Sequence, residues 1–450
     1  MTFSFPGTFI LPDITMAGKQ IIELLNRHIL PLESSRDLDP LMERIGEARI
    51  VMLGEASHGT HEYYTWRSRL SKRLIAEKGF DFIAVEGDWP DCYKINRYIK
   101  HYGPQQEHAI DVIKLFDRWP TWMWANWEVV ALAEWMKQYN SQRQGHERTG
   151  FYGLDVYSLW DSLYEIREYL QKTDPALLPD AERAFRCFEP YHHDEGQSYA
   201  RATRLVPASC EQEVIKVLHS IQSRMQSYDH DVENAFSTEQ NALIAVNAEK
   251  YYRSMLEGGA ASWNIRDEHM QETLERLLDF HGSTSKAIVW AHNTHIGDAS
   301  ATDMADEGMY NIGELARRHF GRGRVVLVGF GSYTGSVVAG SRWGADMEVM
   351  EVPQAMSDSW EEALHETDHV NKMLLMEELR QEPLLTDEVI GHRAIGVVYN
   401  PRFEQYGNYV PSRLPLRYDA FIHIDETKAL HALDVKADIH KMPETYPFGE

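Results

Sequence analysis

The stretch GEASHG, residues 54–59, places Glu55 and His58 three residues apart directly after an apolar run. A histidine titrates near neutral pH, so His58 can serve as a general base or acid that a carboxylate orients. Ser57 invites comparison with the serine nucleophile elbow G-x-S-x-G, but the glycine stands three residues before it, and the chain contains no such motif. We therefore favour His58 over Ser57. The non-catalytic alternative is a turn whose polar residues cap the next helix.

A second set of candidates follows later apolar runs. Glu86 ends the run in AVEGDW, and His292 and His295 follow IVW in WAHNTHIGD. The two histidines could act as acid, base or oxyanion donor. They could instead be core histidines bonded to backbone carbonyls, or metal ligands together with Glu55, Glu86 or His58. None of the runs that carry these candidate residues contains an HExxH motif, which leaves a zincin-type use of them without support.

Arg67 lies on a helix that the sequence predicts between Thr60, as its cap, and Gly79, as its end. It shares a helix face with leucines that should pack on a sheet, so its guanidinium points toward protein and needs a carboxylate or an anion there. We expect an ion pair with Glu55 or Glu86, an anion-binding role, or both.

Three further residues are predicted to contact substrate: Asp88 in EGDWPD, and Arg266 and Asp267 in WNIRDEHM. The simpler interpretation of Asp88 is a cap for the helix that begins WPDCYKI. The simpler interpretation of Asp267 is an acidic residue in the first turn of a helix, where it complements the helix dipole.

The elements that must position these residues are short apolar runs, each followed by glycine or a polar residue. Being apolar on both faces, they predict buried strands of a largely parallel sheet flanked by helices, which is an α/β fold. Ligands of such sheets bind at the carboxyl ends of the strands, where the candidate residues lie. The predicted strands cover residues 49–55, 82–89, 151–157, 286–295, 324–331 and 393–400.

Strand signals vanish between residues 158 and 283, where long amphipathic stretches predict helices. We interpret 158–283 as a helical insertion, a lid-like subdomain, in an α/β catalytic core made of residues 1–157 and 284–450.

Composition restricts the class of protein. The net charge of −24, from 45 basic and 69 acidic residues, disfavours a nucleic-acid or anionic-membrane partner. No window is apolar enough to span a membrane and the N-terminus does not resemble a secretory signal, so we expect a cytoplasmic protein. The three cysteines, Cys92, Cys187 and Cys210, lack CxxC spacing and support neither a disulfide framework nor a zinc site.

Taken together, GEASHG, an arginine nine residues past His58, VEGDWPD and WAHNTHIG resemble the erythromycin esterase family. The resemblance extends over roughly residues 48–425 and includes YDAFIHIDET, which is similar to that family's C-terminal strand. It implies a parallel sheet with flanking helices and a helical segment.

The resemblance also implies an activity. His58 would be the general base that activates water, and Glu55, Arg67, Glu86, His292 and His295 would complete the catalytic set. The expected substrate is a small-molecule carboxylic ester or lactone, with macrolides as one candidate, and no metal or other cofactor is expected. Two alternatives stay open: a metal-dependent hydrolase using the same glutamates and histidines, and a non-catalytic protein that binds a small ligand.

Overall fold

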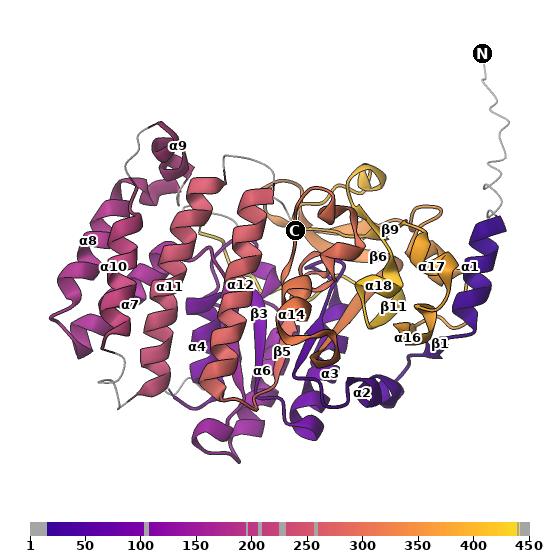
Figure 1. Ribbon diagram of the computed structural model, residues 1–450, viewed down its shortest axis with the longest axis horizontal. Helices are drawn as coiled ribbons and strands as arrows, with labels where there is room; N and C mark the ends of the chain where they lie inside the picture. Colours follow the sequence, from indigo (N-terminus) through magenta and orange to yellow (C-terminus); the bar gives the residue numbers. More distant parts are fainter. Residues whose placement is uncertain are drawn as a thin grey trace.

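The computed structural model describes residues 16–102, 108–194, 197–205, 209–224, 231–255, 260–438 and 441. A nine-stranded sheet in the order β1-β8-β11-β6-β2-β5-β3-β4, with β7 beside β6, forms its centre (Figure 1). The strands are β1 (Ile29–Pro31), β2 (Ile50–Leu53), β3 (Phe82–Asp88), β4 (Gly150–Asp155), β5 (Ala287–Trp290), β6 (Val325–Gly340), β7 (Met347–Val352), β8 (Lys372–Leu375) and β11 (Ala420–Thr427).

The strands from β11 to β4 run parallel to their neighbours, whereas β1, β8 and β7 pair antiparallel. The predicted α/β fold with a largely parallel sheet is therefore confirmed. Strands β9 (Ile390–Arg393) and β10 (Tyr409–Ser412) form a separate two-stranded sheet.

Side-chain alternation along the central strands explains why helices cover both faces. In β2, Val51 and Leu53 join one hydrophobic core, whereas Ile50 and Met52 join another. Successive residues of a strand point to opposite faces, so a run of four apolar residues builds two cores at once. Helices α2, α3 and α6 line the first core, and α11, α12 and α14 line the second; Figure 1 shows α11 and α12 side by side.

The helices begin and end as follows: α1 (Met16–Asn26), α2 (Asp39–Ile45), α3 (His61–Lys78), α4 (Trp89–Ile99), α5 (Ala109–Ile113), α6 (Trp127–Asn140), α7 (Leu159–Thr173), α8 (Leu178–Phe188), α9 (Gln197–Leu205), α10 (Glu211–Gln222), α11 (Val232–Ser254), α12 (Ala260–His281), α13 (Asn293–Ile296), α14 (Ile312–Phe320), α15 (Trp360–His365), α16 (Met376–Leu379), α17 (Pro383–Asp387) and α18 (Leu414–Arg417). None of the helices in the described ranges combines the length and apolar character needed to cross a bilayer.

The described part of the predicted insertion consists of helices α7 to α12, without a strand. Helices α7 to α11 enclose a third hydrophobic core, at one end of the sheet (Figure 1). Helix α12 and part of α11 also pack on the sheet itself, since Phe236, Ile244, Met270 and Leu274 belong to the core on that face. The last two helices therefore join the insertion to the sheet. Its motion as a lid stays a prediction.

Residues 393–400 do not form the predicted strand of the central sheet. Arg393 ends β9, and the residues after it form isolated bridges, Ser57 with Ile395 and Gly340 with Val398. The backbone N–H of Ile395 donates to the Ala56 carbonyl at 2.8 Å. This apolar run is buried because it lies against the GEASHG loop, which periodicity alone does not distinguish from burial in a sheet.

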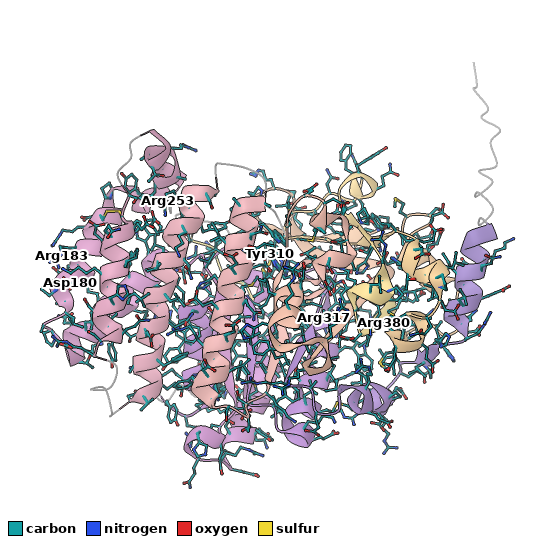
Figure 2. All side chains as sticks on the ribbon, viewed as in Figure 1. Asp180, Arg183, Arg253, Tyr310, Arg317 and Arg380 are labelled. Atoms are coloured by element: carbon teal, nitrogen blue, oxygen red, sulfur yellow. A yellow bond between two sulfur atoms is a disulfide. The ribbon has the colours of Figure 1, made fainter. Side chains whose placement is uncertain are left out.

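One buried carboxylate fixes the start of β11. Asp419 accepts hydrogen bonds from Arg317 of α14 and from Arg380, which follows α16, both at 2.7 Å. Figure 2 labels Arg317 and Arg380, which both lie in the right half of the view. The backbone N–H of Leu327 in β6 also donates to Asp419, at 2.9 Å. These bonds hold two neighbouring parallel strands in register where they enter the sheet.

The expectation that the cysteines form no disulfide is wrong. Cys187 of α8 and Cys210, at the start of α10, are bonded, with their Cα atoms 5.8 Å apart, and Cys92 is free and buried. Helices α8 and α10 lie side by side in the third core and bring together two cysteines 23 residues apart. Their spacing in the sequence carries no such signal.

Reduction of the Cys187–Cys210 bond should lower the free energy of unfolding of the helical part. Loop-closure entropy for a separation of this size gives an effect of about 3 kcal/mol. Urea unfolding with and without a phosphine reductant measures it. The double variant Cys187→Ser/Cys210→Ser is the matched control and should not respond to reductant. An equal response of wild type and double variant would contradict the prediction.

Candidate active site

The loop after β2 carries Glu55 and His58, and two glycines allow it to pass close to other chain segments. A Cβ atom on Gly54 would lie 2.1 Å from Oδ1 of Asn293, and one on Gly59 would lie 1.9 Å from the Val338 carbonyl oxygen. Strand β2 lies between β5 and β6 in the sheet. The loop therefore emerges at the carboxyl ends of central parallel strands, as the sequence predicts.

His58 is oriented by Glu55, whose carboxylate is shared with Arg67. Nδ1 of His58 lies 3.1 Å from Oε1 of Glu55, and Nη2 of Arg67 donates to Oε2 at 2.6 Å. All three side chains are buried. Nε2 of His58 has no hydrogen-bond partner among the described residues. With Nδ1–H donating to the carboxylate, the lone pair of the neutral imidazole lies on Nε2.

Arg67 is a buried charged residue on α3, a helix that packs on the sheet. Its guanidinium carbon lies 4.4 Å from the ring centre of Tyr64 and 4.6 Å from that of Trp290. Of the two ion pairs that the sequence left open, the structure contains the one with Glu55. The aromatic faces and the carboxylate together accommodate a fully buried cation.

Arg266 of α12 binds three groups from three different elements. Its Nη2 donates to Oε1 of Glu86 at 2.6 Å and to Oδ2 of Asp155 at 2.7 Å, and its Nε donates to Oδ1 of Asp155 at 3.0 Å. Its Nη1 lies 2.8 Å from Nε2 of His295. Burial works against the charge of Glu86, but His295, Arg266 and His58 outweigh it and hold the pKa of Glu86 well below its usual range.

His295 and Asp267 form a buried pair beside Arg266. Nδ1 of His295 lies 2.9 Å from Oδ2 of Asp267, and its ring stacks on Trp263 at 4.5 Å between centres. Burial alone would lower the pKa of His295, but Asp267 and Glu86 raise it. Oδ1 of Asp267 also accepts the backbone N–H of Ile312, at the start of α14.

The prediction that Asp267 lies in the first turn of its helix is wrong, because α12 has already begun at Ala260. The acidic residue instead serves the neighbouring helix α14 and the imidazole of His295.

His292 lies between two groups of charged residues, the group around Glu55 and His58 and the group around Glu86 and Arg266. Its backbone N–H donates to Oε2 of Glu86 at 2.8 Å, and its Nδ1 lies 2.8 Å from Oγ1 of Thr294 and accepts from the Thr294 N–H at 3.4 Å. Its ring centre lies 5.0 Å from that of His58. Nε2 of His292 has no hydrogen-bond partner among the described residues, although the His292 side chain lies close enough to the backbone of Ala56 to interact with it. Burial, followed by the nearby His58, lowers the pKa of His292 well below its ordinary value.

Asp88 belongs to a different group of charges. It precedes α4 in the N-cap position without a side-chain cap bond, and its carboxylate pairs with Arg118, which also donates to Asp161 at 3.1 Å. Burial raises the pKa of Asp88 to about 7. The other predicted site residues, from Glu55 to His295, lie in one continuous set of contacts through Glu86 and His292.

Asp155 and Asn293 are site residues that the sequence-based set lacks. Asp155 ends β4 as Glu86 ends an apolar run, so its position at a strand end was an available signal. Asn293 donates to the Phe330 carbonyl at 2.6 Å, and its backbone N–H donates to the Glu55 carbonyl at 2.9 Å. Nothing in its sequence position indicates this role.

The alternative of a metal on Glu55, His58, Glu86 and His292 finds no support in the arrangement. The oxygens of Glu86 accept from Arg266 and the His292 backbone, and Glu55 is shared between Arg67 and His58. In the part of the chain that the structure describes, ligand atoms converge within 4.8 Å at one group of three only, His61, Glu128 and His431.

Comparison with known proteins now identifies the family. The family model described as erythromycin esterase matches residues 75–427, more than three quarters of the 450 residues. The chain belongs to the erythromycin esterase family. The matched span begins after Glu55, His58 and Arg67, so the family match does not bear on these three residues.

Curated relatives and solved structures are distant. A Bacillus subtilis protein, putative hydrolase YbfO, is 23% identical over 292 residues, which cover 60% of this chain and 62% of YbfO. An Escherichia coli erythromycin esterase type II is 22% identical over 327 residues, 69% of this chain and 75% of that protein. The chain thus spans less than two thirds of YbfO.

Solved structures share the fold. A Bacillus cereus protein has a TM-score of 0.75 at 20% identity, covering 93% of this chain and 99% of that one. A mutant of the erythromycin esterase EreC, in a form described as its open conformation, has a TM-score of 0.63 at 15% identity, covering 91% and 97%.

The buried pair of Arg67 and Glu55 allows a stability test. Arg67→Met leaves Glu55 buried without its counter-charge and should lower the free energy of unfolding by about 3–5 kcal/mol. Adding Glu55→Gln should restore part of this loss, because the second change removes the unpaired charge. Urea unfolding of the wild type, of Arg67→Met, of Glu55→Gln and of the double variant measures the effect. A double variant that has lost the sum of the two single effects would refute this coupling.

The lowered pKa of His292 implies that the free energy of unfolding depends on pH. Its lowered pKa means that the unfolded chain takes up a proton near pH 6.5 while the folded chain does not. This group therefore costs no stability above pH 6.5, and stability falls as the pH drops below it, by up to about 1.4 kcal/mol per unit.

Urea unfolding at pH 7, 6 and 5 should show the stability of wild type falling toward that of His292→Gln or below it as the pH drops. His319→Gln, which changes an exposed histidine, should track wild type. A difference between wild type and His292→Gln that does not change with pH would contradict the assignment.

Proposed function

We propose that this chain is a hydrolase that cleaves a carboxylic ester or lactone of a small molecule by general-base activation of water. The observation that carries the proposal is His58: its Nδ1 is held by Glu55, and its buried Nε2 has no partner among the described residues. An imidazole oriented at one nitrogen and free at the other is the arrangement of a general base.

Different tautomers give His58 and His292 different chemical roles. Glu55 accepts Nδ1–H of His58, so Nε2 of His58 can accept a proton from water. Nδ1 of His292 accepts from the Thr294 N–H, so Nε2 of His292 carries a proton that it can donate. The lowered pKa keeps His292 neutral at pH 7. The ring centres, 5.0 Å apart, leave the base and the donor on neighbouring positions of one site.

The reaction then proceeds as an ordinary ester hydrolysis. His58 removes a proton from water, the hydroxide oxygen bonds to the carbonyl carbon, and Nε2–H of His292 stabilises the negative charge that develops on the carbonyl oxygen. The tetrahedral intermediate collapses, the bond to the alkoxide oxygen breaks, and the proton held by His58 passes to the alkoxide. The products are a carboxylic acid and an alcohol. No step requires a metal or another cofactor.

The remaining charges position these two imidazoles. Arg67 pairs with Glu55 at 2.6 Å and so supplies a counter-charge, in a buried site, to the carboxylate that holds His58. Arg266, Asp155 and Glu86 fix the backbone of His292. Both ring nitrogens of His295 are engaged, by Asp267 and Arg266, so we assign it a positioning role.

The substrate class rests on the family and on the burial of the site. The names of two relatives, a putative hydrolase and an erythromycin esterase, support hydrolysis of an ester, and macrolide lactones are one candidate substrate. His58 and His292 are each at most 1% exposed, so a substrate must be admitted by opening of the chain. We propose that the outer helices of the segment 158–283, α7 to α10, open as a lid would, while α11 and α12 stay packed on the sheet.

Hydrolysis of simple aryl esters, lactones and 14-membered macrolides tests the proposal. His58→Ala should lower kcat by at least about a hundredfold, because general-base catalysis contributes that much or more. His319→Ala, on the surface, should keep wild-type activity. Far-UV circular dichroism verifies that both variants are folded.

Wild-type kcat in the His58→Ala variant would overturn the assignment of the base. Binding of a ligand from this panel without turnover, by a wild-type chain that hydrolyses none of the panel, would favour the binding-protein alternative.

A further inference from the structure

Three side chains outside the proposed active site converge on one point. Nδ1 of His61, the first residue of α3, lies 2.6 Å from Oε1 of Glu128, in the first turn of α6. Nδ1 of His431, which follows β11, lies 2.7 Å from the same oxygen. The carboxylate is buried, with 4% of its side chain exposed, whereas the His61 and His431 side chains are 31% and 63% exposed. One side of the group is therefore open to solvent.

The donor set is that of a transition-metal site. Two imidazole nitrogens and a carboxylate oxygen are the protein ligands of many zinc sites that keep a fourth position for water.

The spacing fits after a small adjustment. Ligand atoms around a tetrahedral zinc ion lie about 3.4 Å apart, given metal–ligand distances near 2.1 Å. The two nitrogen–oxygen separations must therefore lengthen by less than about 1 Å. The exposed ring of His431 can make most of this movement, and all three ligand atoms already lie within 4.8 Å of one another.

The group ties a C-terminal segment to the loop that carries His58. Residues 428–433, the C-terminal segment, lie against this loop and against the start of α6. The backbone N–H of Leu430 donates to the Gly59 carbonyl at 3.0 Å, and that of Leu433 donates to the Ala125 carbonyl at 2.8 Å. His61 lies three residues past His58, and its N–H donates to the Lys428 carbonyl at 2.8 Å. A ligand that joins His61, Glu128 and His431 would fasten all three elements at once.

We propose that His61, Glu128 and His431 bind one divalent transition-metal ion of the zinc class, which fastens the C-terminal segment to the start of α3 and α6. The ion has a structural role and takes no part in the hydrolysis proposed above, since none of its ligands belongs to the His58 and His292 cluster. The two proposals stand or fall separately. A chelator can lower activity through this site, so metal dependence of hydrolysis is informative only in a variant without it.

Zinc titration of the full chain tests the site. Isothermal titration calorimetry of metal-stripped protein with Zn²⁺ at pH 7.5 should give one ion per chain. His431→Ala and His61→Ala should each weaken binding at least about tenfold, because each removes a ligand. His319→Ala is the matched control, since it removes an exposed histidine whose Nδ1 lies 3.3 Å from Oε1 of Glu275, in a His–Glu pair elsewhere on the surface.

Two further readouts keep the test independent of hydrolysis. Zn²⁺ should raise the thermal midpoint of wild type and of His319→Ala, but not that of His431→Ala. Co²⁺ should give a visible absorption band in the wild type that is lost in Glu128→Gln. Because the His431 side chain is exposed, we expect His431→Ala to fold. Far-UV circular dichroism verifies that this variant is folded.

The proposal is overturned if metal-stripped wild type binds no Zn²⁺, or binds it equally well in the wild type, His61→Ala and His431→Ala. Weak binding at several sites, unaffected by these substitutions, would mean adventitious surface binding and would overturn it as well.

Discussion

Arg266 is fully buried, and its guanidinium contacts Asp155 and Glu86, from strands β4 and β3, and His295, from the short helix α13. A buried cation without partners is too costly to fold, so these elements must meet around it. Glu86, held by Arg266, then fixes the backbone of His292. The position of one of the two facing imidazoles therefore depends on this guanidinium.

The guanidinium of Arg67 does for His58 what that of Arg266 does for His292, from the opposite face of the sheet. Arg67 neutralises Glu55, which orients His58. Both arginines lie on helices that cover opposite faces of the sheet, α3 and α12, and both reach the carboxyl ends of its strands. The site thus takes one charge pair from each face of the sheet. The rings of His58 and His292, with their centres 5.0 Å apart, lie where the two pairs meet.

The sequence predicted what strand ends and motifs can show. Short apolar runs located the parallel strands β2 to β6, and polar residues behind them located Glu55, Glu86 and His292. The parallel strand β11 was indicated only by its resemblance to the family's C-terminal strand. Pairings between distant elements were out of reach, because they depend on which helices cover which face. The disulfide between Cys187 and Cys210 is one such pairing.

The apolar run at 393–400 shows a different limit. It is buried against a loop and not within the central sheet, and local periodicity is the same in both cases. Asp267 shows a third: its helix starts earlier than its local sequence suggests, so the residue serves His295 and α14 instead of its own helix terminus.

General-base catalysis at this site requires that Glu55 hold His58 in the tautomer that leaves Nε2 free to accept a proton. Histidine-selective ¹⁵N labelling and nuclear magnetic resonance at pH 8 measure this directly, with the signal of His58 assigned by its loss in His58→Ala. We expect a protonated Nδ1 and an unprotonated Nε2, and a shift of this signal in Glu55→Gln. A His58 that carries its proton on Nε2 could not act as the base at that nitrogen, and this result would overturn the role proposed for His58.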